Sequence, residues 1–573
     1  MKGQGISEGL AIGRAWIVNR GLPEFSDWPP EPPTLAADRF RDLRDRLAAR
    51  LAQAGEQAAQ RGDGTRSEIL EAHRMMLGDP ELEAAVHEAL KQGTPLPAAI
   101  GTALQGFIDL MEALADPYLK GRAADYRDLS HQLLWALAGR EGHQGPEPGQ
   151  DWIVVAEDFA PSDISLAESG AVLGFLSQGG APATHFSILA RIAGLPVVIR
   201  VPEALKQIAQ GDLLVLDGTA GTVVINPDPE TLSTAKAEQE AALQAARQLE
   251  GLRKERTRTL DGVEYHLEGN IAGPQDVARL VDHGAEGIGL FRTEFIYMDR
   301  ATAPTEAEQA EIYRQVLAAA APLPVVIRTL DVGGDKELPY LGIPKEENPF
   351  LGFRAVRCCL ARPELFRTQL RALLRASVAG NLQIMVPMIS GLEEVRQVKA
   401  LLAQCREELL AERVPVADSV KLGIMVEVPA AAAMAPLLAE EADFFSIGTN
   451  DLIQYMMAAD RMNPQVAYLY TPYHPAFLRT LQAVIDGAHG GGIPAAMCGE
   501  LAGDTAFIPV LVGLGLDRFS MNAGALLKAR RRIRTLRASD CRALVAHLMT
   551  LRTKAEIRGA VAAFGQEHGH ETA

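Results

Sequence analysis

From residue 262 onward, short apolar runs alternate with helical segments, and this alternation limits the possible fold of the larger part of the chain. The runs cover residues 264–270, 287–292, 324–329, 382–388, 422–427, 444–448, 494–498 and 518–521. Eight strands with intervening helices over about three hundred residues are the count and size of a (β/α)₈ barrel. We therefore predict an α/β multidomain chain whose C-terminal part, residues 262–573, is a TIM-like barrel.

Polar residues stand at the ends of most of these apolar runs. They are Arg292, Arg328, Glu427, the pair Asn450 and Asp451, and Cys498. In (β/α)₈ barrels the C-terminal strand ends build the active site. Simple strand termination does not explain why most of the ends carry anion-binding or metal-binding side chains. The sequence therefore predicts an active site at this end of the barrel.

The residue types at these ends indicate a small, multiply anionic substrate. Glu427 and Asp451 come from adjacent strands and could each give one oxygen to a Mg²⁺ ion that keeps other positions for substrate. Planar guanidinium groups bind phosphate and carboxylate bidentately, and four are available: Arg292, Arg328, Arg354 and Arg461. Cys498 ends the seventh strand and is a candidate proton donor or nucleophile, although a lone cysteine more often serves packing. No G-x-x-x-x-G-K-[ST] motif occurs, so a P-loop nucleotide site is not indicated.

One of the histidines in the first half of the chain, His185, follows a glycine-rich turn at 179–183 and opens a short helix. Residues 171–176 upstream are typical of a buried strand, and Gly194 ends the helix. Thr184 is the expected N-cap, which leaves His185 in the first turn, where free backbone N–H groups and the helix dipole favour an anion. A lone histidine there is more often incidental. The phosphate chemistry expected of the barrel favours a phosphoryl group carried on His185.

The rest of the first half consists of a helical block between two β-rich segments. Residues 1–20 contain a β-like segment, and short strands are again expected at 152–156, 171–176, 196–199, 213–216 and 222–225. Between them, apolar residues recur at three- and four-residue steps to about residue 140. We predict an α/β domain from residues 1–20 plus 148–228, a helical domain inserted at 21–147, and a helical linker at 229–261.

Composition places the chain among ordinary globular proteins, with 47% hydrophobic and 23% charged residues among 573. No signal peptide opens the sequence and no apolar run is long enough to span a bilayer, so we expect a cytoplasmic protein without membrane insertion. The net charge of −17 argues against a nucleic-acid partner and suits either solubility or docking of a basic protein. The five scattered cysteines are expected to be reduced, and the basic run 528–537 to be a solvated helix face.

Several stretches resemble the phosphoenolpyruvate–protein phosphotransferase family, known as enzyme I of the bacterial sugar phosphotransferase system. The likeness runs over essentially the whole chain and is most specific at 284–295, 327–339, 346–354, 423–429, 444–451 and 497–503. It implies an N-terminal phosphohistidine domain with an inserted helical domain that docks the carrier protein HPr. It also implies a linker and a barrel that binds phosphoenolpyruvate (PEP) and Mg²⁺ and forms a homodimer.

The resemblance also assigns roles residue by residue. His185 matches the phosphorylated histidine and Cys498 the proton donor. The remaining matches are Glu427 and Asp451 as metal ligands, Arg292, Arg328, Arg461 and Asn450 as the substrate clamp, and Arg354 and Lys336 as accessory residues of the pocket. The implied reaction moves the phosphoryl group of PEP to His185 and then to a histidine of HPr, with release of pyruvate.

The segment around the histidine departs from the family pattern. Thr-Ser usually precedes the histidine and a small or hydroxylic residue follows it, whereas here Ala183 and Thr184 precede it and Phe186 follows. The change at Ala183 bears on the orientation of the imidazole and on its rate of transfer. It leaves the nucleophile in place.

Three other functions fit parts of the sequence. Pyruvate phosphate dikinase and PEP synthase share the histidine and barrel parts but carry a large ATP-binding domain before the histidine, where this chain is helical without a nucleotide motif. The nitrogen-related, regulatory form of enzyme I usually has an additional N-terminal sensory domain. The third alternative is a regulator that binds PEP or a carrier protein without turnover, which only the departures around His185 support.

Overall fold

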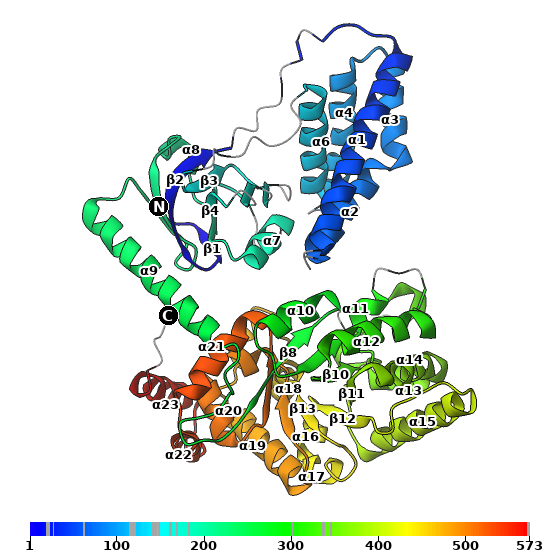
Figure 1. Cartoon of the computed structure of the whole chain (residues 1–573), viewed down its shortest axis with the longest axis vertical. Helices are drawn as coiled ribbons and strands as arrows, with labels where there is room; N and C mark the ends of the chain where they lie inside the picture. Colours follow the sequence, from blue (N-terminus) through cyan, green and yellow to red (C-terminus); the bar gives the residue numbers. More distant parts are fainter. Residues whose placement is uncertain are drawn as a thin grey trace. The chain divides into compact units, whose positions relative to one another are not determined.

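A computed structural model of the chain divides into two compact units, Met1–Ala246 and Arg247–Ala573, which are described one at a time (Figure 1). The structure describes residues 1–18, 23, 25–26, 28–60, 64–113, 122–139, 146, 149–159, 163–164, 166–167, 170–180, 184–298, 300, 302–334, 338–343 and 346–569.

The first unit contains a seven-stranded sheet in the order β1-β5-β4-β3-β2-β6-β7. Its strands are β1 (Gln4–Ser7), β2 (Leu10–Ile17), β3 (Trp152–Ala156), β4 (Val172–Ser177), β5 (Val197–Ile199), β6 (Leu213–Asp217) and β7 (Thr222–Ile225). β2 pairs in parallel with β3 and antiparallel with β6, so the N-terminal strands complete a sheet whose other strands follow residue 150. The predicted insertion of a helical block into one α/β fold is thereby confirmed.

The inserted block consists of helices with a core of their own. They are α1 (Pro33–Gln60), α2 (Gly64–Leu77), α3 (Pro80–Lys91), α4 (Leu96–Ala113) and α6 (Ala123–Leu137). Phe40, Leu47, Val86, Ile100 and Leu129 are among the buried side chains that pack together between them. These positions repeat at helical spacing along the sequence, which is why the block was predictable from periodicity.

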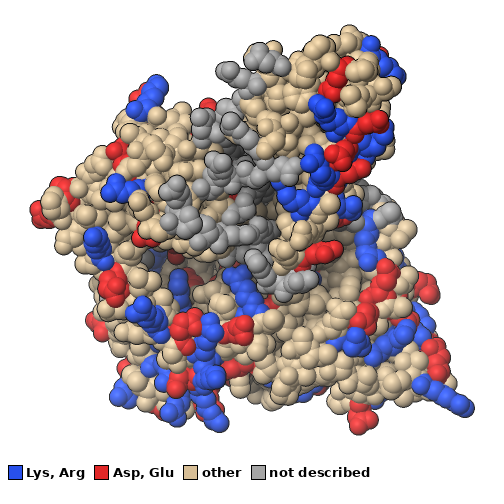
Figure 2. Space-filling view, turned by 45° about the horizontal axis from the view of Figure 1, so that its top comes forward, with Lys and Arg blue, Asp and Glu red and all other residues tan. Residues whose placement is uncertain are grey.

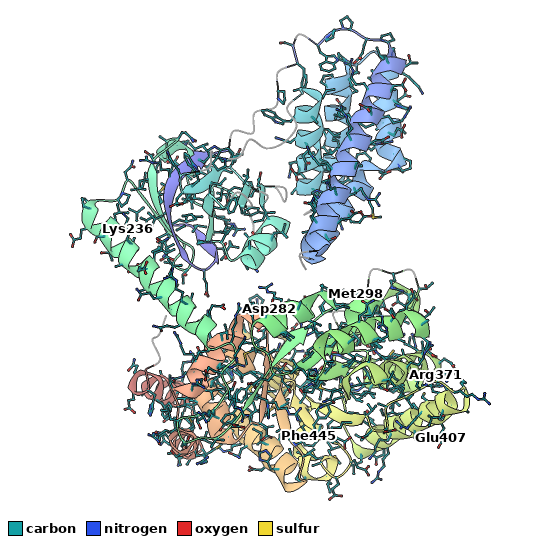
Figure 3. All side chains as sticks on the ribbon, in the orientation of Figure 1. Lys236, Asp282, Met298, Arg371, Glu407 and Phe445 are labelled. Atoms are coloured by element: carbon teal, nitrogen blue, oxygen red, sulfur yellow. The ribbon has the colours of Figure 1, made fainter. Side chains whose placement is uncertain are left out.

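Helices α7 (His185–Ala193) and α8 (Ala204–Gln207) belong to the sheet part of this unit, and α9 (Pro229–Gly251) follows its last strand. Ala235 is the buried residue of α9 within the described part of the chain, and Lys236 beside it projects outward (Figure 3). The side-chain amide of Gln239 donates a hydrogen bond of 3.2 Å to the carbonyl oxygen of Leu10. The first half of α9 is therefore tied to the N-terminal sheet.

The second unit is a closed barrel of eight strands, in the order β10-β11-β12-β13-β14-β15-β8-β9. The strands are β8 (His266–Ile271), β9 (Ile288–Arg292), β10 (Pro324–Arg328), β11 (Asn381–Val386), β12 (Lys421–Val426), β13 (Phe445–Ile447), β14 (Ala495–Met497) and β15 (Arg518–Met521). Every neighbouring pair is parallel. Each strand falls on one of the eight apolar runs, so the predicted (β/α)₈ barrel is confirmed.

Helices surround the barrel strands. They are α10 (Gln275–Asp282), α11 (Glu294–Tyr297), α12 (Glu306–Ala320), α13 (Val356–Ala361), α14 (Pro363–Ala376), α15 (Leu392–Ala411), α16 (Pro429–Ala433), α17 (Ala435–Leu438), α18 (Thr449–Met457), α19 (Pro475–Gly490), α20 (Ile508–Leu514), α21 (Ala523–Arg534), α22 (Ala538–Leu548) and α23 (Lys554–Glu567). Phe445 of β13 is buried in the core between strands and helices, whereas Glu407 of α15 points outward (Figure 3). A smaller cluster inside the barrel includes Leu290, Met425 and Cys498.

The expectation that the basic run 528–537 forms a solvated helix face is wrong for two of its arginines. Arg530 and Arg532 are only 1% and 5% exposed. Arg530 donates to the carbonyl oxygens of Leu252 at 3.0 Å and Arg253 at 2.8 Å, just beyond the end of α9. A guanidinium group has five N–H donors, so one buried arginine can satisfy several carbonyl groups that a chain leaves open after a helix.

Other global features agree with the composition. On the face drawn in Figure 2, acidic and basic side chains are interspersed over the barrel unit. All five cysteines are buried and free of disulfides. Within the described part of the chain, no helix is both long and apolar enough to cross a membrane.

Candidate active site

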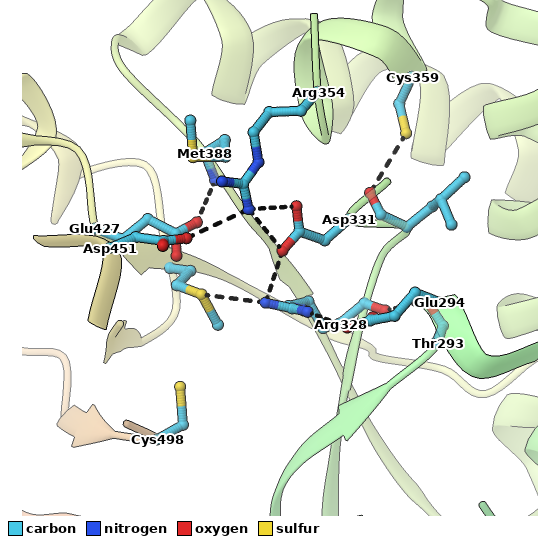
Figure 4. A network of polar contacts seen from close by, with 12 residues as sticks. Thr293, Glu294, Arg328, Asp331, Arg354, Cys359, Met388, Glu427, Asp451 and Cys498 are labelled. Carbon is cyan, nitrogen blue, oxygen red and sulfur yellow. Dashed lines mark hydrogen bonds and ion pairs between the residues drawn. The ribbon is translucent and has the colours of Figure 1, made fainter. Parts of the chain in front are cut away.

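The C-terminal ends of the barrel strands bring Arg328, Arg354, Glu427 and Asp451 together in a buried region (Figure 4), and the partly exposed Arg461 contacts Asp451 from its edge. Arg328 is the last residue of β10, Glu427 follows β12 directly, and Asp451 lies in the first turn of α18 after β13. Arg354 and Arg461 come from loops beyond β10 and β13. Parallel strands present their carboxyl ends at the same rim, which explains how residues far apart in sequence meet here.

Arg328 and Arg354 are joined by a carboxylate that lies between them. Nη1 of Arg328 is 3.0 Å from Oδ2 of Asp331, and Nη2 of Arg354 is 2.9 Å from its Oδ1. Nη2 of Arg328 also donates to Oε1 of Glu294 at 2.7 Å. Burial opposes the charged form of Arg328, yet the carboxylates of Glu294 and Asp331 raise its pKa above the usual range. Burial likewise opposes the charged form of Arg354, and the carboxylates of Asp331 and Asp451 raise its pKa above the usual range. Both arginines therefore remain charged although they are shielded from water.

The carboxylate of Asp451, expected to bind a metal, is in direct contact with two of the arginines expected to bind an anion. Nη2 of Arg354 lies 3.3 Å from Oδ2 of Asp451, and Nη1 of Arg461 lies 3.5 Å from its Oδ1. Both guanidinium groups also stand over the ring of Phe350, each 5.8 Å from its centroid. Arg354 donates a further bond of 3.1 Å to the hydroxyl of Tyr455. Ion pairs and cation–π contacts of this kind fix the direction of long side chains.

Glu427 and Asp451 fit the chemistry of a divalent-cation site. Glu427 is 2% exposed, and one of its oxygens accepts a bond of 2.7 Å from the backbone N–H of Met388. Burial and the neighbouring charge of Asp451 raise the pKa of Glu427 well above its usual range. Two close carboxylates that destabilise each other's charge suit a bound cation. No group of three or more His, Cys, Asp or Glu side chains in the described residues is arranged around a metal, so a cation here would take further oxygens from substrate or water.

Cys498 follows β14 and is 3% exposed. Burial raises the pKa of its thiol, while the positive charges of Arg328 and Arg292 act in the opposite direction. Its backbone carbonyl oxygen accepts a hydrogen bond of 3.1 Å from the side chain of Asn270 on β8. A thiol that keeps its proton at neutral pH and stands at the strand ends has the properties of a proton donor.

Of the other predicted residues, Arg292 ends β9 and Asn450 lies beside Asp451 in α18. The hydroxyl of Tyr470 donates to the backbone carbonyl of Asn450 at 3.3 Å. Lys336 lies outside the described residues.

The sequence reasoning missed the two carboxylates that pair with Arg328. Glu294 opens α11 two residues after Arg292, and Asp331 follows Arg328 by three residues. Both belong to the stretches that carry the family resemblance. The signal that could have identified them is a carboxylate that follows an arginine at a strand end by two or three residues in the sequence.

His185 is the first residue of α7, as predicted. The side-chain oxygen of Thr184 accepts a hydrogen bond of 3.3 Å from the backbone N–H of Ser187, and Gly194 ends the helix with φ 68°. Only glycine adopts this left-handed conformation without strain. The side chain of His185, like the whole of Ala183, lies outside the described residues.

Phe186, one of the departures from the family pattern, is part of the core of the N-terminal sheet. It is 2% exposed, stacks on Phe159 at 4.4 Å between ring centroids, and meets Phe175 edge-on at 5.1 Å. Aromatic pairs at these distances are stabilising beyond the area they bury. The aromatic residue at this position therefore anchors the first turn of α7 to the sheet.

Several known proteins and protein families are similar to this chain. Three protein families match: "PEP-utilising enzyme, PEP-binding domain" at residues 246–538, "PEP-utilising enzyme, N-terminal" at 2–122, and "PEP-utilising enzyme, mobile domain" at 148–221. A phosphoenolpyruvate-protein phosphotransferase of Geobacillus stearothermophilus is 44% identical over 567 residues, which cover 96% of each chain. The same enzyme of Staphylococcus carnosus is 41% identical over 558 residues, or 97% of each chain.

A solution structure titled as enzyme I matches 42% of this chain and 99% of its own, at 28% identity and a TM-score of 0.36. The two curated relatives, in contrast, are similar over nearly the full length. The chain therefore belongs to the phosphoenolpyruvate–protein phosphotransferase family of PEP-utilising enzymes.

Proposed function

We propose that this enzyme transfers the phosphoryl group of PEP to its own His185 and then to a histidine of the carrier protein HPr, releasing pyruvate. The observation that carries the proposal is the connected network of Arg328, Arg354 and Arg461 with the carboxylates of Glu427 and Asp451. Few ligands other than a small phosphorylated carboxylic acid need both arginine clamps and a divalent cation in one buried site.

PEP would bind with its phosphate and carboxylate among the arginines, Arg292, Arg328, Arg354 and Arg461, with Asn450 and Lys336 beside them. Glu427 and Asp451 would hold Mg²⁺, which when bound neutralises negative charge on the transferring group. The fixed arginine charges stabilise the same charge in a site shielded from water, where they act more strongly than in solution.

In the first step, a ring nitrogen of His185 attacks phosphorus, and the bond between phosphorus and the bridging oxygen of PEP breaks. The electron pair stays on that oxygen and gives the enolate of pyruvate. Positioned cations around the transferring oxygens are the main requirement of phosphoryl transfer. The N-terminal turn of α7, capped by Thr184, offers free backbone N–H groups to the phosphoryl group on His185.

Cys498 would complete the step by giving its thiol proton to the terminal carbon of the enolate, which forms the methyl group of pyruvate. The raised pKa of this thiol supports the role, because the group is protonated before the reaction. The resulting thiolate regains a proton from solvent before the next cycle, which balances the proton that the imidazole ring loses from its other nitrogen when it is phosphorylated.

The acceptor would be a histidine of HPr, docked on the helices inserted at residues 21–147, and the barrel would form the homodimer. The negative net charge of −17 suits a basic partner. Since one histidine serves two partners in turn, the phosphohistidine domain must move as a body between the reactions.

A regulator that binds PEP without turnover is the main alternative. Its support came from the departures around His185, and the packing of Phe186 in the sheet core weakens it. Incubation with PEP labelled on phosphorus distinguishes the two. We expect an acid-labile label on His185 that purified HPr then removes, with equimolar pyruvate formed. A protein that binds PEP but acquires no label would be the regulator.

A further inference from the structure

Asp331 occupies a central place in the barrel network without belonging to the residues expected to touch substrate. Its side chain is 2% exposed and lies between two guanidinium groups (Figure 4). Oδ2 is 3.0 Å from Nη1 of Arg328 and 3.2 Å from Nη2 of Arg354, while Oδ1 is 2.9 Å from the same Nη2. A single carboxylate oxygen thus bridges the two arginines.

This bridge determines how close the two arginines can lie. Two like charges that lie close together in a poorly hydrated site repel each other more strongly than they would in water. Arg328 and Arg354 are only 7% and 4% exposed, so water cannot relieve this repulsion. With the negative charge of Asp331 between them, both guanidinium groups face the same point. Without it, they would separate or take other rotamers.

The bridge also reduces the charge that the arginines offer to an anion. Arg328 is paired with Glu294 as well as Asp331, and Arg354 with Asp451 as well as Asp331. An incoming phosphate or carboxylate therefore meets donors that are already partly satisfied. Tight binding of a substrate before the reaction does not accelerate the chemical step, whereas interactions that strengthen in the transition state do.

We propose that Asp331 is a positioning residue of this enzyme: it fixes the spacing of Arg328 and Arg354 and offsets part of their charge, so that the pair favours the transferring phosphoryl group over bound PEP. The inference rests on the proposed function, since it concerns the same reaction. It adds to that function that the carboxylate of Asp331 acts on substrate only through the two arginines.

Two substitutions in the full-length protein separate spacing from charge. Asp331→Asn keeps the size of the side chain and one oxygen acceptor but removes the charge, and Asp331→Glu keeps the charge but places it one methylene farther out. The measurement is the single-turnover rate of label transfer from PEP to the protein, with Mg²⁺, as a function of PEP concentration. It gives a maximal rate and a half-saturating concentration for each variant.

For Asp331→Asn we expect a maximal rate at least about tenfold lower, with a half-saturating PEP concentration equal to or below that of the unsubstituted protein. For Asp331→Glu we expect a lower maximal rate and no gain in PEP binding. Glu306→Gln is the matched control, because Glu306 also bridges two arginines. It lies on α12 and contacts Arg371 at 2.7 Å and Arg375 at 2.8 Å on α14, in the layer of helices that surrounds the barrel strands. The control should leave both parameters unchanged.

A rise of the half-saturating concentration in step with the fall in rate would overturn the proposal, because a merely structural aspartate weakens binding as well. An unchanged maximal rate in Asp331→Asn would also overturn it. If Asp331→Asn does not fold, Asp331→Glu provides the test. A maximal rate of Asp331→Glu equal to that of the unsubstituted protein would then contradict the proposal. Failure of the unsubstituted protein to take label from PEP would instead reject the proposed function.

Discussion

Nη2 of Arg354 lies 3.3 Å from Oδ2 of Asp451, so a residue expected to bind the anion is in contact with a residue expected to bind the metal. The second oxygen of Asp451 faces Arg461 at 3.5 Å, which extends the same contact to a second arginine. We therefore expect a substitution of a carboxylate proposed to bind the metal to alter the binding of the anionic substrate as well.

The first prediction compares the two carboxylates. Glu427→Gln and Asp451→Asn should each lower the rate of label transfer from PEP by about a hundredfold or more, because each removes a ligand and a negative charge that favours a cation. Both substitutions should in addition raise the half-saturating PEP concentration, because the cation that these carboxylates would hold is expected to share oxygens with PEP. Rates are measured over a range of Mg²⁺ concentrations and after addition of EDTA. A rate that EDTA leaves unchanged would contradict the metal role of both residues.

The second prediction contrasts neighbours in α7. His185→Ala should abolish phosphorylation because it removes the proposed nucleophile. It should leave the free energy of unfolding unchanged, because the position is the first residue of a capped helix. Phe186→Ala should instead destabilise the N-terminal unit by about 3–5 kcal/mol, the usual cost of removing a buried aromatic ring. All four tryptophans fall within residues 1–246, so their fluorescence follows the urea unfolding of this unit. Phosphorylation of His185→Ala by PEP would place the nucleophile at another residue.

The third prediction concerns Cys498. Cys498→Ser should slow pyruvate formation by about a hundredfold or more, because a hydroxyl is a far weaker acid than a thiol, and general acids contribute about 10² to 10⁴ in rate. PEP binding should change little, since the proton is needed only after the phosphoryl group has left. Both are obtained from rapid-quench measurement of pyruvate at several PEP concentrations. Equal losses in rate and in binding would indicate that the cysteine serves packing inside the barrel.

Much of the fold was predictable, because the signals were local and repeated. Each barrel strand is a short apolar run whose pattern does not depend on distant residues, and the cap of α7 by Thr184 and Gly194 follows from the residue types alone. Arg530 was not predictable from its own surroundings. Its burial depends on the carbonyl groups of Leu252 and Arg253, which lie in another part of the chain.

The site was predictable to a different degree. The rule that polar residues at strand ends face the active site located Arg328 and Glu427, since each stands at or next to the last residue of its strand. The rule does not say which partner a guanidinium group takes. That Asp331 bridges Arg328 and Arg354 depends on the path of the loop after β10, and loops carry little periodic signal.

The fourth prediction uses a carboxylate inside the barrel away from the proposed metal site. Glu268 of β8 is 2% exposed, one of its oxygens has no hydrogen-bond partner among the described residues, and Arg518 is 3.5 Å from the other. Burial raises the pKa of Glu268 to about 7. The folded state therefore favours the protonated form. The stability this gives is fully present below the unfolded pKa of about 4.3 and is lost as the pH rises through the folded pKa.

Glu268→Gln should remove this pH dependence. Between pH 5 and pH 8 the variant should gain about 2–3 kcal/mol in unfolding free energy relative to the unsubstituted protein. Urea unfolding followed by circular dichroism at the two pH values provides the measurement. Glu407→Gln is the control, because Glu407 is exposed on α15. An equal pH dependence in both variants and the unsubstituted protein would mean that Glu268 is ionised in the fold at neutral pH.

The last prediction is that the two units fold and work apart when the chain is cut at residue 246. Residues 1–246 hold the complete seven-stranded sheet, the inserted helices and His185, and their cores contain no barrel residue. Arg530 binds the carbonyl oxygens of Leu252 and Arg253, so a cut after those residues would remove contacts of the barrel unit, whereas a cut at 246 keeps them.

A fragment of residues 1–246 should exchange phosphoryl groups reversibly with phosphorylated HPr and take no label from PEP. The fragment 247–573 should bind PEP with Mg²⁺, measurable by calorimetry, and the proposed dimer should persist in it. Label transfer from PEP to the fragment 1–246 alone would contradict the location of the substrate site in the barrel, because the arginines and carboxylates of that site all follow residue 246.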